Sequence, residues 1–294
     1  MSEQHLSSNT GDNTYILDAE SAIEMARLLD QDKIMTQNMG GIFGEREDTD
    51  LLGVSAILDI ACGPGGWVLD VARTYPHIEV TGIDISKNAI SYARAQTRLL
   101  KLQNAHFEVM DALKPLKFPD ESFDVVNMRT VIGFVLPQLW PQFLQECWRL
   151  LRPGGIIRIT EAEWGFSNKA AFELLMLKTS QALQRLNRSF SPNGINIGIT
   201  PVLRPLLQQA NFEQVKMKAY VADGSYGVEG YEASYQDLKL LFELSRPLWL
   251  HTKVMTEQET EALNAQALDE MQEEDFYTLS YLLTVWGVKP DVGA

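Results

Sequence analysis

Cysteine and histidine are scarce in this chain of 294 residues, which contains two cysteines and four histidines. Two cysteines are too few for a disulfide-stabilised scaffold, and we expect both Cys62 and Cys147 to lie in buried segments. Neither residue type has the spacing of a metal site, such as C-x-x-C or H-E-x-x-H, so the sequence indicates no bound metal. These scarcities exclude disulfide-rich secreted proteins and favour a reducing, cytoplasmic compartment.

Positive charge and long apolar runs are also lacking. The formal net charge is −14 at pH 7, which disfavours broad contact with nucleic acid or with an anionic membrane. No apolar run approaches the length of a membrane span, so we expect no membrane insertion. Residues 1–13 are polar and lack the apolar core of a signal peptide, and we expect them to be a disordered tail.

Glycine, in contrast, is concentrated at one point of the chain. Residues 57–67 read I-L-D-I-A-C-G-P-G-G-W, an apolar strand followed by a glycine-rich turn and then a helical pattern. Glycine lets the backbone approach a bound nucleotide closely, because no Cβ stands in the way. A second expected strand ends in Asp84, roughly 20 residues beyond the turn, where a carboxylate can accept hydrogen bonds from both hydroxyls of a ribose.

Two classes of cofactor fit this arrangement. A dinucleotide is disfavoured because Gly63 and Gly65 do not form G-x-G-x-x-G, and because Asp59, just before the turn, would repel a pyrophosphate. Asp59 suits instead a ligand that carries an ammonium group and a sulfonium. The segment resembles motif I, D/E-x-G-x-G-x-G, of the class I S-adenosylmethionine-dependent methyltransferases, with Ala61 in place of the first glycine.

The resemblance covers Tyr15 to Glu163 with gaps, and it implies a set of cofactor-binding residues. In the family's pattern Asp84 holds the ribose, Asp111 in F-E-V-M-D-A pairs with the adenine amino group, and Asp59 either lies near the ammonium group or braces the turn. Tyr15 belongs to an N-terminal segment that folds over the cofactor in many relatives. The predicted cofactor-binding residues are Tyr15, Asp59, Ala61, Gly63, Gly65, Asp84, Ile85, Asp111, Ala112 and Asn127.

Strand and helix patterns alternate through the first half of the chain, which predicts an α/β fold with a parallel sheet. The expected strands are 55–60, 78–83, 105–110, 123–128 and 155–161, and the helices between them are 66–75, 86–102 and 138–151. Two late strands, 212–222 and 277–288, resemble the hairpin that completes the family's sheet. The prediction is thus a Rossmann-like sheet of seven strands, mostly parallel with an antiparallel last strand, and a helical cap.

Four regions follow from these patterns. They are the tail 1–13, an N-terminal helical cap 14–53, the cofactor-binding core 54–165, and 166–294, which completes the sheet and adds helical insertions that cap the acceptor site. The N-terminal helix is expected from Tyr15 onward, with Asp18 or Ser21 as its N-cap.

Methyl transfer needs little acid–base chemistry, because a sulfonium is a strong electrophile and the acceptor has only to be held in line with it, away from water. In this fold the segment after the fourth strand lies beside the transferring methyl, and here it contains Arg129. Glu161 is expected at the end of the fifth strand. We predict that Arg129 and Glu161 are catalytic residues facing the acceptor. Aromatic and methionine side chains outside the core fit a small, partly apolar acceptor.

The sequence therefore indicates methyl transfer from S-adenosylmethionine to O, N or C of a small metabolite, by a monomer or homodimer related to the ubiquinone and menaquinone biosynthesis enzymes. Three alternatives are open. They are a noncatalytic module that binds S-adenosylmethionine, a methyltransferase acting on protein or RNA, and an NAD-dependent reductase. The acceptor and the methylated atom do not follow from the residues.

Overall fold

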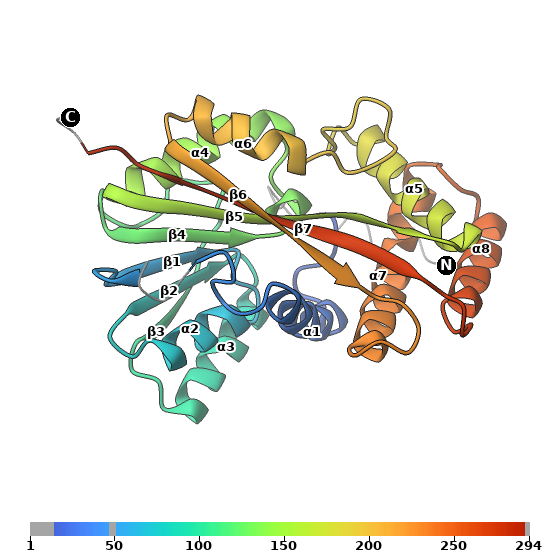
Figure 1. Cartoon of the computed structure of the whole chain (residues 1–294), viewed down its shortest axis with the longest axis horizontal. Coiled ribbons are helices and arrows are strands. Elements are labelled where there is room, and N and C mark those ends of the chain that lie inside the picture. Colours follow the sequence, from blue (N-terminus) through green and yellow to red (C-terminus); the bar gives the residue numbers. More distant parts are fainter. Residues whose placement is uncertain (1–14, 47–50, 292–294) are drawn as a thin grey trace.

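A seven-stranded sheet forms the centre of the computed structural model, which describes residues 15–46 and 51–291 (Figure 1). The predicted tail 1–13 lies outside the described residues. The strands are β1 Ala56–Ile60, β2 Glu79–Asp84, β3 Ala105–Val109, β4 Phe123–Arg129, β5 Leu151–Ser167, β6 Glu213–Asp223 and β7 Thr278–Val288. Their order is β3-β2-β1-β4-β5-β7-β6, with β1 to β5 parallel and β7 antiparallel to both of its neighbours. The predicted fold class is confirmed.

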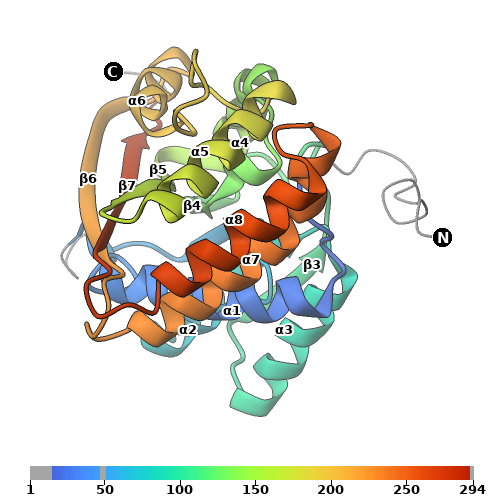
Figure 2. The same cartoon turned by 90° about the vertical axis from the view of Figure 1, so that its right-hand side faces the viewer.

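Helices cover both faces of the sheet. They are α1 Ala22–Asn38, α2 Gly66–Thr74, α3 Lys87–Leu100, α4 Trp140–Leu150, α5 Ala170–Arg185, α6 Thr200–Gln209, α7 Tyr231–His251 and α8 Glu257–Glu270. In Figure 1, α4 and α6 lie above the sheet, and α1, α2 and α3 lie below it. Figure 2 shows α7 and α8 side by side, with α1 next to α7. None of the described helices combines the length and the apolar composition that crossing a bilayer requires.

The apolar runs of β1 and β4 explain why these strands lie in the middle of the sheet. Ile57, Leu58 and Ile60 are at most 1% exposed, because successive side chains of a strand point to opposite faces of the sheet and helices cover both faces. Leu58 and Ile60 belong to the cluster that contains residues of α4, whereas Ile57 packs with residues of α2. The carboxyl ends of these strands are therefore held rigidly by the core.

Strand β5 is longer than the predicted segment 155–161. It continues to Ser167 because β7 pairs with it as far as Ser167 and Thr278, well beyond the last residue pair that joins it to β4. Glu161 accordingly lies inside the strand and not at its end. The carboxylates at positions 161 and 163 suggested a strand end facing the acceptor, but in the fold they accept hydrogen bonds from backbone N–H groups of other segments.

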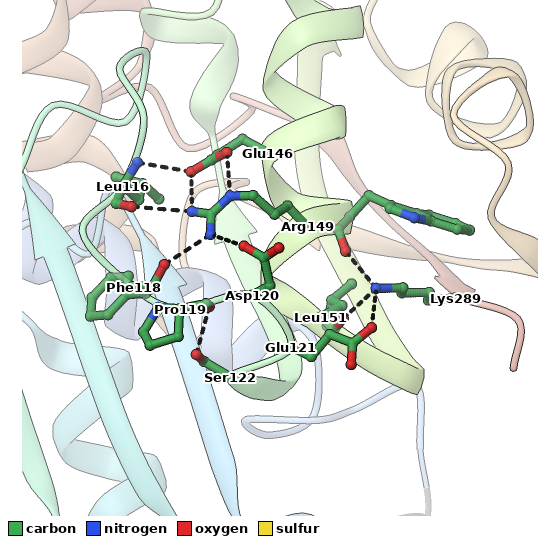
Figure 3. Close-up of polar contacts among 11 residues, drawn as sticks. Leu116, Phe118, Pro119, Asp120, Glu121, Ser122, Glu146, Arg149, Leu151 and Lys289 are labelled. Carbon is green, nitrogen blue, oxygen red and sulfur yellow. Dashed lines mark hydrogen bonds and ion pairs between the residues drawn. The ribbon is translucent and has the colours of Figure 1, made fainter. Parts of the chain in front are cut away.

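The crossover between β3 and β4 is anchored to α4 by Arg149 (Figure 3). The Arg149 guanidinium donates to the carbonyls of Leu116 (3.1 Å) and Phe118 (2.8 Å) and to the carboxylate of Asp120 (2.7 Å). Glu146, one turn earlier on α4, accepts from Arg149 (2.6 Å) and from the N–H of Leu116 (2.8 Å). These contacts fix the path of the chain from the tip of β3 to the start of β4.

Helix α1 begins where a side chain can cap it. The Ser21 Oγ accepts a hydrogen bond from the N–H of Glu24 (3.3 Å), so Ser21 and not Asp18 is the N-cap. Beyond the C-terminus of the helix, Gly40 and Gly41 have φ angles of 77° and 133°, which end it and turn the chain. The helix thereby crosses the carboxyl ends of the central strands.

Candidate active site

A cavity lies at the carboxyl ends of β1, β2, β3 and β4, and α1 forms one of its walls. Open α/β sheets bind ligands at this edge. The cavity and its open mouth together contain about 1170 Å³ of space outside the protein atoms. Eight of the ten predicted cofactor-binding residues line it, namely Tyr15, Asp59, Ala61, Gly63, Asp84, Ile85, Asp111 and Ala112. The other two, Gly65 and Asn127, lie behind this lining.

The turn after β1 adopts left-handed backbone at three positions. Ala61, Gly63 and Gly65 have φ angles of 57°, 53° and 84°. The left-handed conformation at Ala61 explains why the family's pattern has a glycine there, since alanine adopts it at a cost of roughly 1–2 kcal/mol. At Gly65 a Cβ would come within 2.5 Å of the Phe107 ring, so this glycine is required by packing beneath the turn.

Asp84 is held rigidly at the tip of β2. Its Oδ2 accepts a hydrogen bond from the N–H of Gly63 (2.9 Å), and its Oδ1 accepts one from the N–H of Ser86 (2.8 Å). Burial raises the pKa of Asp84, and these two N–H donors oppose the rise. Each carboxylate oxygen has further acceptor capacity. The arrangement can accept hydrogen bonds from two neighbouring hydroxyl groups in the cavity.

The tip of β3 adds an apolar slot with one polar edge. Ile85 and Ala112 line the cavity from neighbouring loops. Asp111 accepts a hydrogen bond from the N–H of Leu113 (3.0 Å) and pairs with Lys114 (3.1 Å), and its side chain is 18% exposed. Apolar walls beside a carboxylate suit a flat aromatic ring that carries an amino group.

Asp59 is a buried carboxylate that faces the cavity from the end of β1. Its Oδ1 accepts a hydrogen bond from the Asn127 Nδ2 (2.7 Å). Burial raises the pKa of Asp59 to about 7, while the Asn127 hydrogen bond and the positive charge of Arg158 oppose the rise. Asn127 was predicted as a cofactor-binding residue. In the structure it is fully buried behind Asp59 and contacts that side chain.

The two predicted catalytic residues occupy different environments. Arg129 lines the cavity, where it pairs with Asp32 of α1 and donates to the Thr36 Oγ1 (3.1 Å). Glu161 is fully buried and does not line the cavity; its Oε1 accepts from the N–H of Ile132 (3.0 Å), in the turn after Arg129. Arg129 thus joins α1 to the tip of β4, and Glu161 braces the turn that follows Arg129.

The carboxyl of Glu161 is only partly paired. Its Oε2 is buried and has no hydrogen-bond partner among the described residues. Burial raises its pKa to about 8, and the N–H groups of Ile132 and Val131 oppose this rise. A carboxyl with such a pKa is protonated at neutral pH, and its proton then makes one of the two oxygens a hydroxyl group.

Tyr15 ties the N-terminal segment to the helical insertion. Its hydroxyl donates to the Glu24 carboxylate (2.6 Å), and Glu24 accepts from the Arg27 guanidinium (2.7 Å). Arg27 also donates to Asp237 of α7 (3.0 Å). Burial and the Glu24 charge raise the pKa of Tyr15, so its hydroxyl remains a donor. Tyr15 also lines the cavity.

Sequence reasoning missed the residues that only the fold brings to the site. Leu28 and Asp32 line the cavity from α1, and their helix was predicted without any indication of which face meets the sheet. Arg158 and Glu45 form a buried ion pair behind Asp59. Arg158 had a signal in the sequence, since a charged residue in the strand I-I-R-I-T requires a buried partner. Glu45 had none.

Comparison with known proteins agrees with this geometry. A family model described as a methyltransferase domain matches residues 57–155, the segment that contains β1 to β4 and the start of β5. The phosphoethanolamine N-methyltransferase 3 of Arabidopsis thaliana is 34% identical over 125 residues, which are 42% of this chain and 24% of that protein. The demethylmenaquinone methyltransferase of Listeria welshimeri is 36% identical over 102 residues, 34% of this chain and 41% of that enzyme. The chain thus spans less than half the length of these curated relatives.

A solved structure extends the likeness beyond the matched segment. A candidate methyltransferase from Bacillus halodurans C-125 superimposes with a TM-score of 0.50 at 17% identity. The superposition covers 81% of this chain and 94% of that one, and at this identity it concerns the fold alone. Residues 57–155 thus match a methyltransferase domain, and the superposition shows that most of the chain shares the fold of that solved structure.

Proposed function

We propose that the chain transfers a methyl group from S-adenosylmethionine to O, N or C of a small, partly apolar molecule. The observation that carries the proposal is the fixed carboxylate of Asp84, which faces the cavity from the tip of β2 with both oxygens oriented by backbone N–H groups. The named activities of the two sequence relatives, on phosphoethanolamine and demethylmenaquinone, support a small acceptor.

The chemistry of the lining fits this cofactor. Asp84 would hold the ribose, the slot with Asp111 and Ala112 would hold the adenine, and Asp59 beside Gly63 would face the charged amino-acid end. Acidic side chains suit a ligand with an ammonium group and a sulfonium, whereas they would repel the pyrophosphate of a dinucleotide. This donor set therefore favours S-adenosylmethionine over the NAD alternative.

When bound, S-adenosylmethionine supplies an electrophilic methyl group. The protein's own task is to bind, orient and exclude water, and such positioning can lower a barrier by roughly 7–11 kcal/mol. Arg129 and Phe134 line the cavity near the tip of β4 and would face the acceptor, with Leu28 covering them from α1. Glu161 would act by holding the turn after Arg129, because its carboxyl lies outside the lining.

We further propose that residues 14–53 and the helical insertions in 166–294 cap the site. The hydrogen-bonded chain from Tyr15 through Glu24 and Arg27 to Asp237 supports this division, because it joins the N-terminal segment to α7. A cap of this kind would restrict access to the cavity, which suits a small acceptor better than a protein or an RNA. The net charge of −14 also argues against RNA.

The test replaces Asp84 by alanine. We expect the affinity for S-adenosylmethionine, measured by calorimetry, to fall at least about tenfold, since two charge-assisted hydrogen bonds are lost. Asp70→Ala on the exposed face of α2 is the matched control and should leave the affinity unchanged. Equal affinities of Asp84→Ala and the parent chain would refute the site.

Methyl transfer is tested separately with labelled S-adenosylmethionine and a panel of phenols, amines and quinol precursors. Label in a small product supports the proposed reaction. Binding without transfer to any panel member or to components of a cell extract would favour the noncatalytic module instead. Label in protein or RNA would overturn the proposal of a small acceptor.

A further inference from the structure

Three polar side chains form a row across the centre of the sheet, beneath the cavity. Asp59 of β1 pairs in register with Asn127 of β4, and Asn127 pairs with Arg158 of β5. Residues opposite one another on neighbouring strands point to the same face. All three are buried, at 4%, 0% and 1% exposure. A row of polar groups in a buried sheet is costly unless its members satisfy one another.

The hydrogen bonds along the row have a fixed direction. The Arg158 Nη1 donates to the Asn127 Oδ1 (2.6 Å), and the Asn127 Nδ2 donates to the Asp59 Oδ1 (2.7 Å). A guanidinium can only donate and a carboxylate can only accept. The orientation of the Asn127 amide is therefore set by its two neighbours, and its NH₂ group must face Asp59.

Glu45 ends the row on the side away from the cavity. Its carboxylate accepts from the Arg158 Nε (2.6 Å) and Nη2 (3.0 Å), a two-pronged pair in which both side chains are at most 1% exposed. The guanidinium also lies 5.6 Å from the centroid of the Phe43 ring and 6.0 Å from that of Trp67. Glu45 and Phe43 belong to the segment that follows α1.

That segment is attached to the body of the domain at two further points. The Trp67 Nε1 donates to the carbonyl of Ile42 (3.3 Å), and the Lys218 Nζ donates to the carbonyl of Gly44 (2.6 Å). Glu45 is thus held at Arg158 by contacts with α2 and β6 as well as by its own charge.

We propose that Glu45, Arg158 and Asn127 are positioning residues that set the charge and orientation of Asp59 for a cationic group of the bound ligand. None of the three lines the cavity. The inference rests on the proposed function, which identifies the cation as the amino-acid end of S-adenosylmethionine. It assigns a role at the cofactor site to Glu45, which lies outside the matched domain 57–155.

The ionisable groups around Asp59 determine what each substitution does. They are Arg158 of β5, Asp84 of β2, the Cys62 thiol, which burial keeps neutral by raising its pKa, and the pair of Asp32 and Arg129 that lines the cavity. Arg158 lowers the pKa of Asp59, whereas burial and Asp84 raise it. Glu45 partly cancels the charge of Arg158, so its removal and the removal of Arg158 have opposite effects on Asp59.

The first measurement is made on the ligand-free protein. Carboxyl resonances of chain labelled with ¹³C-aspartate are followed against pH, and Asp59→Asn identifies the signal of Asp59. Arg158→Met should move the midpoint of this signal upward by roughly one pH unit, and Glu45→Gln should move it downward. The double variant lacks both charges, and its midpoint should lie on the Arg158→Met side. Arg246→Met, on the exposed face of α7, is the control and should leave the midpoint unchanged.

The second measurement follows the affinity for S-adenosylhomocysteine, which retains the ammonium group, by calorimetry over the same pH range. The affinity should fall as Asp59 becomes protonated, and the midpoints of this fall should shift in the same opposite directions. At neutral pH Arg158→Met should bind roughly tenfold more weakly, and Arg158→Lys, which keeps the charge, should recover part of the loss.

If the midpoints of Arg158→Met and Glu45→Gln shift in the same direction, or if neither midpoint shifts, the proposal is overturned. A row with only a structural role would weaken binding at every pH and would leave the midpoints unchanged. Glu45→Gln keeps the test decisive where Arg158→Met is unstable. Opposite shifts of the Asp59 signal in a protein that does not bind S-adenosylhomocysteine would support the row and refute the proposed function.

Discussion

Replacement of Glu161 by glutamine tests how the buried carboxyl in β5 affects stability. Glu161 is fully buried, and only one of its two oxygens has a hydrogen-bond partner among the described residues. Burial raises its pKa from an ordinary value of 4.5 to about 8. Between these two pH values the folded protein keeps a proton that the unfolded chain releases, so the stability of the parent protein falls as the pH rises.

The size of the effect follows from the same interval. At about 1.4 kcal/mol for each pH unit, the interval from 4.5 to about 8 corresponds to about 5 kcal/mol of stability lost at its upper end. Glutamine keeps the acceptor for the N–H of Ile132 but cannot ionise. Its NH₂ group adds a cost that does not depend on pH. The stability difference between Glu161→Gln and the parent should therefore shift in favour of the variant by about 3 kcal/mol between about pH 5.5 and about pH 7.5.

Urea unfolding followed by circular dichroism at these two pH values measures this difference directly. Glu243→Gln, at an exposed position of α7, is the control and should show the same pH dependence as the parent. A parallel pH dependence of Glu161→Gln and the parent would refute the reasoning, because it would mean that Glu161 is ionised throughout and has a partner. Methyl transfer by the folded variant would in addition show that Glu161 supports the turn after Arg129 and does not act as a catalytic base.

Two further substitutions test the turn after β1 and the crossover between β3 and β4. Gly65→Ala should lower the free energy of unfolding by about 3 kcal/mol, because the backbone is left-handed and the new Cβ would lie 2.5 Å from the Phe107 ring. The control is Gly227→Ala, where φ is 76° and no atom lies within 4 Å of the new Cβ. It should lower the free energy of unfolding by only about 1 kcal/mol. Equal losses in thermal or urea unfolding would contradict the role of Phe107. Arg149→Met should cost about 2 kcal/mol in the same assay after allowance for its partial exposure, and the exposed Arg73→Met less than about 0.5 kcal/mol. A loss for Arg149→Met as small as that for Arg73→Met would show that the crossover does not depend on this anchor.

The fold could be predicted from local patterns because each of its central elements has a strong one. The apolar run of β1 precedes glycines, and Ser86 after Asp84 caps α3, as its position indicates. These signals lie within a few residues of the structure they determine. The extension of β5 to Ser167 has no such signal, since it depends on pairing with β7, more than a hundred residues later. Glu161 was placed at a strand end for this reason.

The residues of the candidate site also fall into two groups, those that local sequence patterns predict and those that only the tertiary fold brings to the cavity. Asp84 ends β2 and Asp111 follows β3, and the carboxyl ends of parallel strands meet at one edge, so a sequence pattern suffices to bring them together. Asp32 reaches the cavity only because α1 crosses that edge, and the sequence does not specify the face or angle of this crossing. No period in the sequence links an N-terminal helix to the tip of β4.

Asn127 shows how the second kind of residue can be mistaken for the first. Its position near Arg129 at the end of β4 suggested direct contact with the cofactor, but Asn127 is fully buried outside the cavity lining and donates a hydrogen bond to Asp59. Its amide has one donor side and one acceptor side, so a buried position between a carboxylate and a guanidinium gives each side a partner. The buried amide oxygen needs a donor, which here is Arg158, and the buried charge of Arg158 is paired in turn with Glu45. The polar residues behind the cavity therefore form one connected set, in which the charge of Asp59 depends on a side chain that lies outside the cavity.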